Sequence, residues 1–271
     1  MSHSPTIHLA PQGVAPTVPV APNLIAVASG KGGVGKTFFA ITLCHALAMN
    51  ARKALLFDGD LGLANVDVQL GLMPNRDLGG VIAGRLTLNQ AKTPYVPGGF
   101  DVIAGRSGGG SLAALAPSRL AVLGGDLVEL ARSYDHVIMD LGAGVDRMVR
   151  QLASHAKRRL VVVTAEPTSM TDAYAFIKVT LADDPKAELS VVVNQAKSTP
   201  DGERTFMTLN KACENFLKYS PTLAGVVRRD RKVIESIRSQ SPLLSKFPSS
   251  DAALDVQAIA THIRNADRAE K

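Results

Sequence analysis

Two lysines among four glycines give residues 29–37, SGKGGVGKT, the clearest chemistry in this chain. The segment contains the pattern G-x-x-x-x-G-K-[ST] of a phosphate-binding loop, or P-loop. An apolar run, residues 24–28, precedes it, and a helical pattern, residues 36–49, follows it. Between a strand and a helix, backbone N–H groups and the helix dipole point at one anion. The segment therefore predicts a nucleotide site.

The side chains of this loop have separate expected tasks. Lys36 is placed for the β- and γ-phosphates, and Thr37 for Mg²⁺. Lys31 follows the first glycine, where an ordinary P-loop needs no charge, and repulsion from Lys36 disfavours an idle cation there. We therefore expect Lys31 to turn outward, toward phosphate in a facing subunit. The loop residues expected to bind the nucleotide are Gly30, Lys31, Gly32, Gly33, Val34, Gly35, Lys36, Thr37 and Phe38.

Carboxylates follow two other apolar runs. Asp58 and Asp60 end the run at 54–57, and Asp140 ends the run at 137–139 in a Walker B arrangement. In an open parallel sheet, ligands bind outside the carboxyl ends of the strands, so these acids should face the P-loop. A turn rich in Asp and Gly is the alternative for the first pair. The Asp140 carboxylate is expected to reach Mg²⁺ through a coordinated water.

The elements that must position these residues alternate along the chain. Apolar runs that predict buried parallel strands lie at 24–28, 54–57, 100–104, 136–139, 160–164, 189–193 and 223–227. Helical patterns lie at 36–49, 77–84, 118–132, 146–156, 171–182, 203–218, 230–239 and 250–266. This order predicts an α/β fold with a doubly wound, mostly parallel sheet and helices on both faces. The loop at 105–111, GRSGGGS, should lie at the ligand-bearing edge.

Composition sets outer bounds. The chain has 271 residues, 46% hydrophobic and 20% charged, which is typical of a soluble globular protein. No apolar run reaches transmembrane length and no signal-peptide pattern opens the chain, so we expect a cytoplasmic protein. Residues 1–22 carry five of the 15 prolines and predict a disordered tail, followed by a single P-loop domain at 23–271.

The string KGGVGKT resembles the deviant Walker A motif of the MinD/ParA family of dimerising ATPases. The resemblance implies ATP and Mg²⁺ as ligands and a homodimer in which Lys31 reaches the partner's nucleotide. The segment LLFDGDLGLANVDVQLGL resembles the family's second signature, which implies Asp58 near Mg²⁺ and Asp60 positioning the attacking water. Catalysis would then rest on Lys31, Lys36 and Asp60. Asn194, which could also cap a turn, would read the adenine edge.

Residues 163–175, VTAEPTSMTDAYA, resemble the FlhG subfamily, also called FleN or YlxH, and the likeness runs over roughly 23–260. It implies a dimerisation switch with slow Mg-ATP hydrolysis that regulates the number or placement of flagella. The implied partners are a flagellar GTPase of the FlhF type or a flagellar regulator. The implied locations are the cytoplasm, a cell pole or the inner membrane face. Departures are the missing D-Q-A-x-x-L-R element, Arg228 in place of proline, and Phe38 and Thr42 in the first helix.

The sequence also allows other functions to be compared. A ParA-type ATPase that binds DNA without sequence preference would use the basic cluster Arg228, Arg229, Arg231, Lys232 and Arg238. No aromatic residue interleaves these charges, so a solvated helix face is favoured. The last helix carries a narrow apolar stripe, which favours packing against the domain over membrane insertion. An iron–sulfur carrier needs paired cysteines, and Cys44 and Cys213 are isolated.

Overall fold

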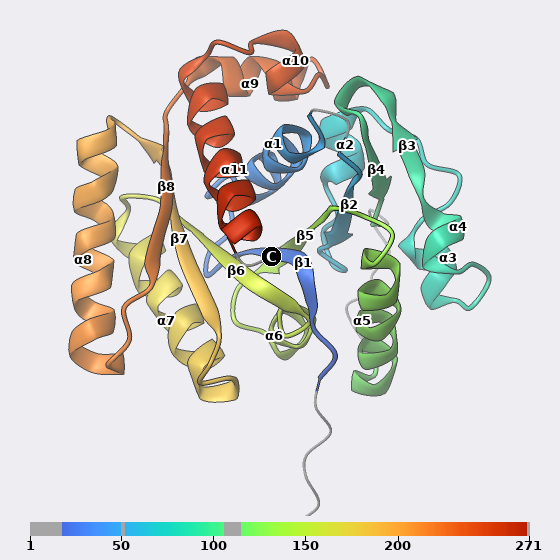
Figure 1. Cartoon of the computed structure of the whole chain (residues 1–271), viewed down its shortest axis with the longest axis horizontal. Helices are drawn as coiled ribbons and strands as arrows, with labels where there is room; N and C mark the ends of the chain where they lie inside the picture. Colours follow the sequence, from blue (N-terminus) through green and yellow to red (C-terminus); the bar gives the residue numbers. More distant parts are fainter. Residues whose placement is uncertain (1–17, 50–51, 106–114, 270–271) are drawn as a thin grey trace, which may run out of the picture.

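A single eight-stranded sheet forms the centre of the molecule, with the strand order β3-β4-β2-β5-β1-β6-β7-β8 (Figure 1). The computed structural model describes residues 18–49, 52–105 and 115–269. Neighbouring strands are parallel except at the β3–β4 pair, which is antiparallel. The predicted α/β fold with a doubly wound, mostly parallel sheet is confirmed.

The strands are β1 (Ala21–Ser29), β2 (Ala54–Gly59), β3 (Thr93–Tyr95), β4 (Phe100–Ile103), β5 (His136–Ala143), β6 (Ala156–Val163), β7 (Glu188–Ala196) and β8 (Thr222–Arg228). The helices are α1 (Lys36–Ala48), α2 (Val66–Leu70), α3 (Leu78–Ile82), α4 (Leu88–Ala91), α5 (Pro117–Ala131), α6 (Arg147–Ala153), α7 (Pro167–Asp183), α8 (Thr199–Leu217), α9 (Arg231–Arg238), α10 (Leu243–Lys246) and α11 (Asp251–Ala269), with a 3₁₀ turn, η1, at Val96–Gly98.

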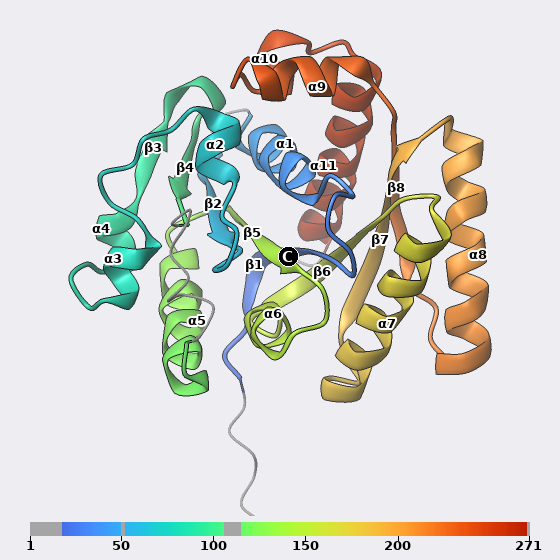
Figure 2. The same ribbon diagram turned by 180° about the vertical axis from the view of Figure 1, so that it is seen from behind.

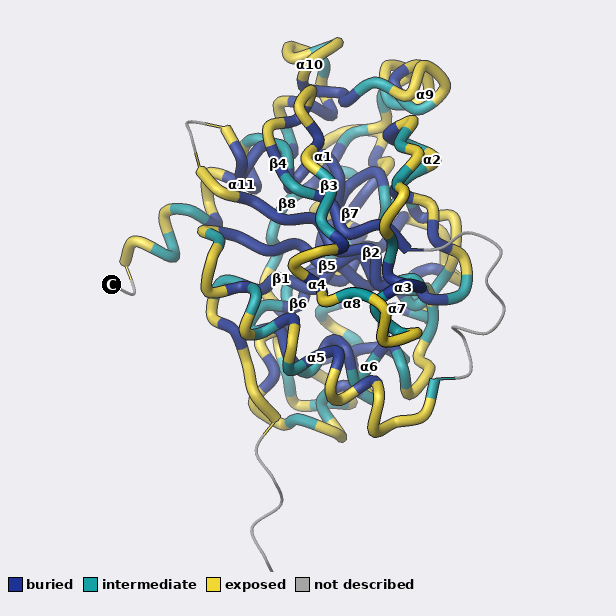
Figure 3. Tube along the Cα trace, turned by 90° about the vertical axis from the view of Figure 1, so that its right-hand side faces the viewer, coloured by how far each residue is buried: buried dark blue, intermediate teal, exposed yellow. Residues whose placement is uncertain are grey.

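Two hydrophobic cores lie on opposite faces of the sheet. Successive residues of β1 point to opposite faces, so Leu24 and Ala26 enter one core while Ile25 and Val27 enter the other. Helices α5 to α8 cover the first core, and α1, α2, α10 and α11 cover the second. Figure 1 shows α1 and α11 above the sheet and α5 and α6 below it, and Figure 2 shows the same layers from behind. The strands are accordingly buried and the outer helix faces exposed (Figure 3).

Short elements account for most differences from the sequence prediction. Helices α2, α4 and α10 and strand β3 were not predicted, because three to five residues give too little periodicity to detect. Strand β1 begins at Ala21, within the last residues of the predicted tail, and the Ala21 N–H donates to the His155 carbonyl at 3.0 Å. Residues 1–17 of the predicted tail and residues 106–111 of the glycine-rich loop lie outside the described residues.

Helix α11 packs on the domain, as its apolar stripe predicted. Val256, Ile259, Ala260 and Ile263 are buried in the core that also contains α1. Within residues 18–49, 52–105 and 115–269, no helix has the length and apolar character needed to cross a membrane.

The sheet order brings the predicted site residues to one edge. Strand β1 lies between β5 and β6, and β2 lies on the far side of β5, so consecutive strands diverge at β1. In open α/β sheets, ligands bind outside the carboxyl ends of the strands at such a switch point. In the β2–β5 pair, Asp58 is the register partner of Asp140, which places both acids beside the loop that follows β1.

Candidate functional site

The phosphate loop ends at an uncapped helix. Gly33 and Gly35 have φ angles of 81° and 84°, a left-handed region that glycine enters without strain. Gly35 is the N-cap of α1, and among the described residues this helix has no side-chain cap hydrogen bond. Unpaired N–H groups at a helix N-terminus form a site for an anion. The backbone of the loop is thus arranged for phosphate.

Neighbouring strands and helices hold the loop in place. The Asn194 side chain, at the end of β7, donates from Nδ2 to the Val34 carbonyl at 2.8 Å. A Cβ at Gly30 would lie 2.1 Å from the backbone oxygen of Asp172 in α7, so only glycine fits there. Asn194 is therefore a loop support in this structure. Its predicted adenine contact stays a prediction that can use the amide oxygen and the second amide hydrogen.

Lys36 forms a buried ion pair with Asp140. The distance from Lys36 Nζ to Asp140 Oδ1 is 2.7 Å, and the side chains are 8% and 1% exposed. Burial raises the pKa of Asp140, and the charge and hydrogen bond of Lys36 and a hydrogen bond from Thr37 oppose this rise. The structure therefore brings Lys36, Thr37 and Asp140 together, as expected of a P-loop and a Walker B carboxylate. The Phe38 side chain is buried in the core, so any contact of Phe38 with the nucleotide would come from its backbone.

Asp58 is a buried carboxylate whose described partners are backbone N–H groups. It accepts hydrogen bonds from the N–H of Asp60 and of Val66, each at 3.2 Å. Burial, and then the nearby Asp140 charge, raise the pKa of Asp58 from 3.8 to about 7. Two carboxylates and a threonine hydroxyl are hard oxygen donors of the kind that Mg²⁺ prefers. A divalent cation would also relieve the repulsion between the acids, so Thr37, Asp58 and Asp140 fit Mg²⁺.

The raised pKa of Asp58 predicts a pH-dependent stability in metal-free buffer. The folded protein keeps this proton up to about pH 7, whereas the unfolded chain loses it near 3.8. The native state thus binds more protons between these values, so the free energy of unfolding falls as pH rises from about 4 to about 7. Asp58→Asn should abolish this contribution. The gain in stability of the variant over wild type should therefore be larger at about pH 8 than at about pH 5, by roughly a few kcal/mol. Urea unfolding of both proteins at the two pH values measures it, and an equal difference at both would contradict it.

Asp60 occupies a turn close to Asp58 and Asp140. Its Oδ1 accepts hydrogen bonds from the N–H groups of Gly62 at 3.3 Å and of Leu63 at 2.9 Å. The carboxylate is partly exposed, and a Cβ at Gly142 would lie 3.5 Å from the same oxygen. Backbone donors thus fix one oxygen of Asp60 between the ends of β2 and β5. This position suits the predicted task of orienting water.

Lys31 is held within its own subunit. Its Nζ lies 2.9 Å from Glu166 Oε2 and 2.9 Å from Thr168 Oγ1, at the N-cap and in the first turn of α7. The Lys31 and Glu166 side chains are 38% and 66% exposed, and exposed ion pairs contribute at most about 1 kcal/mol. Phosphate can therefore replace this partner. Residues 163–175 carry the family resemblance, but no local pattern near Lys31 or Glu166 indicates that the two side chains meet.

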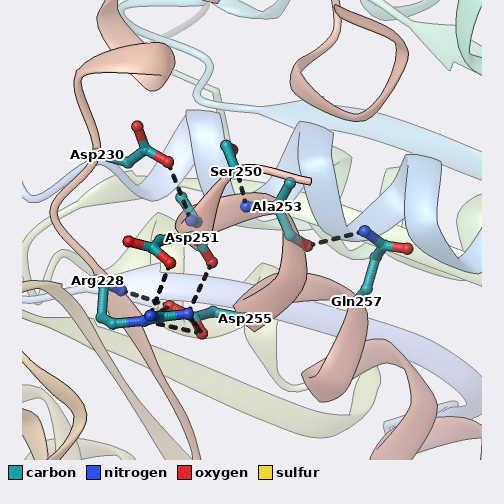
Figure 4. A network of polar contacts seen from close by, with 8 residues as sticks. Arg228, Asp230, Ser250, Asp251, Ala253, Asp255 and Gln257 are labelled. Carbon is teal, nitrogen blue, oxygen red and sulfur yellow. Dashed lines mark hydrogen bonds and ion pairs between the residues drawn. The ribbon is translucent and has the colours of Figure 1, made fainter. Parts of the chain in front are cut away.

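Arg228 belongs to an ion-pair network rather than to a basic surface. Figure 4 shows its guanidinium beside Asp251 and Asp255, and Arg228 Nη2 lies 2.8 Å from Asp255 Oδ1. The Arg228 N–H also donates to Asp255 Oδ2 at 2.9 Å. The network joins the end of β8 to the start of α11. Because of these contacts, Arg228 is not available to the basic cluster considered for DNA binding. Lys232, another member of that cluster, is paired with Glu235.

This network predicts a difference between its two acids. Asp255→Ala should lower the free energy of unfolding by roughly 1–3 kcal/mol, because it removes a bidentate pair and leaves the Arg228 N–H without its acceptor. Asp251→Ala is the matched control, since Asp251 is 61% exposed and its loss should cost less than about 1 kcal/mol. Chemical denaturation compares them. Equal losses of unfolding free energy in the two variants would show that the more buried contacts of Asp255 contribute no more than those of Asp251.

Comparison with known proteins, like the geometry, indicates a nucleotide-binding protein. The model of the CobQ/CobB/MinD/ParA nucleotide binding domain matches residues 25–243. The antiactivator FleN of Pseudomonas aeruginosa is 38% identical over 241 residues, which cover 89% of this chain and 86% of FleN. The flagellum site-determining protein YlxH of Helicobacter pylori is 30% identical over 250 residues, covering 88% of this chain and 83% of YlxH.

A solved structure shares the fold. The septum site-determining protein MinD of Pyrococcus horikoshii, complexed with Mg-ADP, superposes with a TM-score of 0.77 at 23% identity. The match covers 91% of this chain and 97% of that protein.

Proposed function

Because this chain belongs to the CobQ/CobB/MinD/ParA family of nucleotide-binding proteins, we propose that it is an ATP-dependent dimerisation switch in flagellar control. Its enzymatic activity is ATP hydrolysis. The observation that carries the switch is the cluster of Lys31, Lys36, Asp58, Asp60 and Asp140 beside an uncapped helix N-terminus. Each of these residues has a separate task in the proposed cycle.

Nucleotide binding would rearrange the buried ion pair. Lys36 leaves Asp140 for the β- and γ-phosphates, and the N–H groups at the start of α1 bind the same phosphates. Thr37, Asp58 and Asp140 would hold Mg²⁺, which would supply positive charge that neutralises the phosphates. Asp60 orients the water for attack on the γ-phosphate, with Oδ1 fixed by two backbone N–H groups. We expect turnover to be slow until a partner supplies an activating group.

Dimerisation would recruit Lys31. The lysine exchanges Glu166 and Thr168 for a phosphate in the facing subunit, and the exchange costs little because the contact is exposed. Hydrolysis and loss of the γ-phosphate remove the contacts that hold the dimer, as in other nucleotide switches.

Lys31→Ala tests this exchange. The variant should bind ATP with an affinity within about threefold of wild type but remain monomeric in Mg-ATP, because the bridging cation adds roughly 1.5–3 kcal/mol per charged hydrogen bond to the dimer alone. Light scattering on a sizing column gives the mass, and equilibrium titration gives the affinity. Lys211→Ala, which removes an exposed lysine from α8, should dimerise normally. A dimer of Lys31→Ala would show that this lysine is not the bridge.

The flagellar role is supported by the identity to FleN and YlxH, two relatives whose names refer to flagellar or activator control. We propose that this protein sets the number or placement of flagella from the cytoplasm, a cell pole or the inner membrane face. Its partners would be a GTPase of the FlhF type or a flagellar regulator. Counting flagella in a deletion strain rescued with wild type or Lys36→Ala tests the role. Extra or misplaced flagella corrected by wild type alone support it.

The alternative function is the positioning of DNA, and the same deletion strain tests it. Arg229, Arg231 and Arg238 stay exposed near α9, so a weak basic patch persists without Arg228. Normal flagella together with mislocated chromosomes would show that the switch acts in the positioning of DNA. A shift assay with random duplex at low and high salt would then show steep salt dependence.

A further inference from the structure

A second cavity lies at the opposite edge of the sheet from the P-loop. It has a volume of about 530 Å³ and is lined by residues at or just before the starts of strands, including Arg52 before β2, His136 in β5 and Lys157 in β6. Helix α11 closes one side with Arg264 and Arg268. Since the phosphate loop and its acids follow the ends of the same strands, the two sites are separated by the length of the sheet.

The charge in this cavity is mainly positive. Four basic side chains line it against the acids Asp135 and Asp267. Both acids already have partners, because Asp135 accepts from the Lys53 N–H at 2.9 Å and pairs with Arg52, and Asp267 pairs with Arg158. Arg264 donates to Thr261 Oγ1 at 2.9 Å and to the Ala46 carbonyl at 3.5 Å, and within residues 18–49, 52–105 and 115–269 no carboxylate pairs with Arg264 or Arg268. These two guanidinium groups therefore have free donors.

A buried imidazole points to a ligand as well. His136 lines the cavity, is 6% exposed, and its Nδ1 has no hydrogen-bond partner among the described residues. The nearest acid oxygen, on Asp267, is 3.7 Å away, too far for a hydrogen bond. A buried polar atom without a hydrogen-bond partner destabilises the fold unless a ligand or water contacts it. Burial also lowers the pKa of His136, against the raising effect of Asp267 and Asp135.

We propose that this cavity binds the phosphate group of a small phosphorylated metabolite. The Arg264 and Arg268 guanidiniums supply the bidentate forks that match phosphate oxygens, and Arg52, which pairs with Asp135, lies at the rim. The same three arginines also line an adjoining cavity of about 320 Å³, so their donors are reachable from two sides. Pro22 and the Tyr134 ring form an apolar wall beside them, and the volume suits a ligand of nucleotide size.

The depth of the site favours a soluble ligand over a membrane surface. His136 is the first residue of β5, a central strand, and its side chain is almost fully buried. A phosphate that contacts both His136 and α11 must enter the cavity, whereas a headgroup in a lipid surface contacts exposed side chains. The recognised chemistry is a phosphomonoester or pyrophosphate group.

Titration of inorganic pyrophosphate into the full chain tests the site. The protein is first saturated with Mg-ADP so that the P-loop is occupied, and the ring signals of the histidines are followed by carbon–proton correlation spectra. His136→Gln identifies the His136 signal by its absence. We expect that signal to move saturably with pyrophosphate. A signal that stays fixed up to saturating pyrophosphate overturns the proposal.

Arginine variants give the second measurement. Arg268→Ala and Arg264→Ala should each weaken pyrophosphate binding by about tenfold or more, because a charge-assisted hydrogen bond is lost. Arg268 is exposed, so its variant keeps the fold even if Arg264→Ala does not. Arg238→Ala removes the same charge from α9 and should change the affinity less than twofold. Equal weakening in all three would mean non-specific attraction and would overturn the site.

Vesicles containing phosphatidylglycerol form the last arm. Binding of wild type to vesicles that is lost in Arg268→Ala, with no His136 shift by pyrophosphate, would assign these arginines to a membrane surface and overturn the cavity proposal. A His136 shift without vesicle binding supports it.

Discussion

Lys36→Ala is expected to lower the affinity for ATP by at least about 100-fold. Lys36 is the buried cation of the phosphate loop, and its Nζ already lies 2.7 Å from Asp140 at the edge where the phosphates would bind. Losing two charge-assisted hydrogen bonds to phosphate removes roughly 3–6 kcal/mol of binding energy. Equilibrium titration with a fluorescent ATP analogue measures the loss.

The same substitution also leaves Asp140 buried without its cation, which raises a question of folding. Lys36→Ala combined with Asp140→Asn removes both charges and should recover most of the lost stability. The double variant should still fail to bind ATP. A double variant that is stable and binds ATP at wild-type affinity would show that Lys36 serves the fold and not the nucleotide.

Asp60→Ala is expected to keep ATP binding and to reduce hydrolysis by about 10²–10⁴-fold, because the attacking water loses its orienting carboxylate. Dimer should accumulate in Mg-ATP, since the step that dissolves it is blocked. The change is well tolerated locally, because Asp60 is partly exposed and its hydrogen bonds go to the turn at Gly62 and Leu63. Phosphate release and the mass on a sizing column measure the two effects.

Asp60→Asn is the matched control for this prediction. The amide keeps an oxygen that can accept from the same backbone N–H groups, but it lacks the charge that polarises water. It should resemble Asp60→Ala in hydrolysis and wild type in stability. An Asp60→Ala protein that stays monomeric in saturating Mg-ATP would count against the proposed cycle.

The sheet and most of the site could be predicted because their signals are local. Continuous apolar runs such as 54–57 indicate strands buried on both faces, and the acids that end them must share one edge of a parallel sheet. The glycine pattern of the loop likewise reports a backbone conformation, which the left-handed angles at Gly33 and Gly35 confirm. These features need no knowledge of distant contacts.

Partners in space could not be predicted in the same way. Lys31 and Glu166 are separated by 135 positions, and nothing near either residue indicates that they meet. Arg228 looked like one member of a basic cluster, yet Asp251 and Asp255 approach it when α11 folds back on β8. The raised pKa of Asp58 depends on burial and on Asp140 in the next strand. Each of these properties exists only once the chain is packed.

The sequence by itself determined the fold class, the phosphate loop and the three acids, because periodicity and strand ends are encoded within a few residues of each. The tertiary structure alone decided what those groups touch: Lys36 on Asp140, Lys31 on Glu166 and Asn194 on Val34. It also created the basic cavity around His136, whose walls come from strand starts and from a helix far along the chain. Such contacts depend on how the elements pack, and a charge or hydrogen bond has no partner until they do.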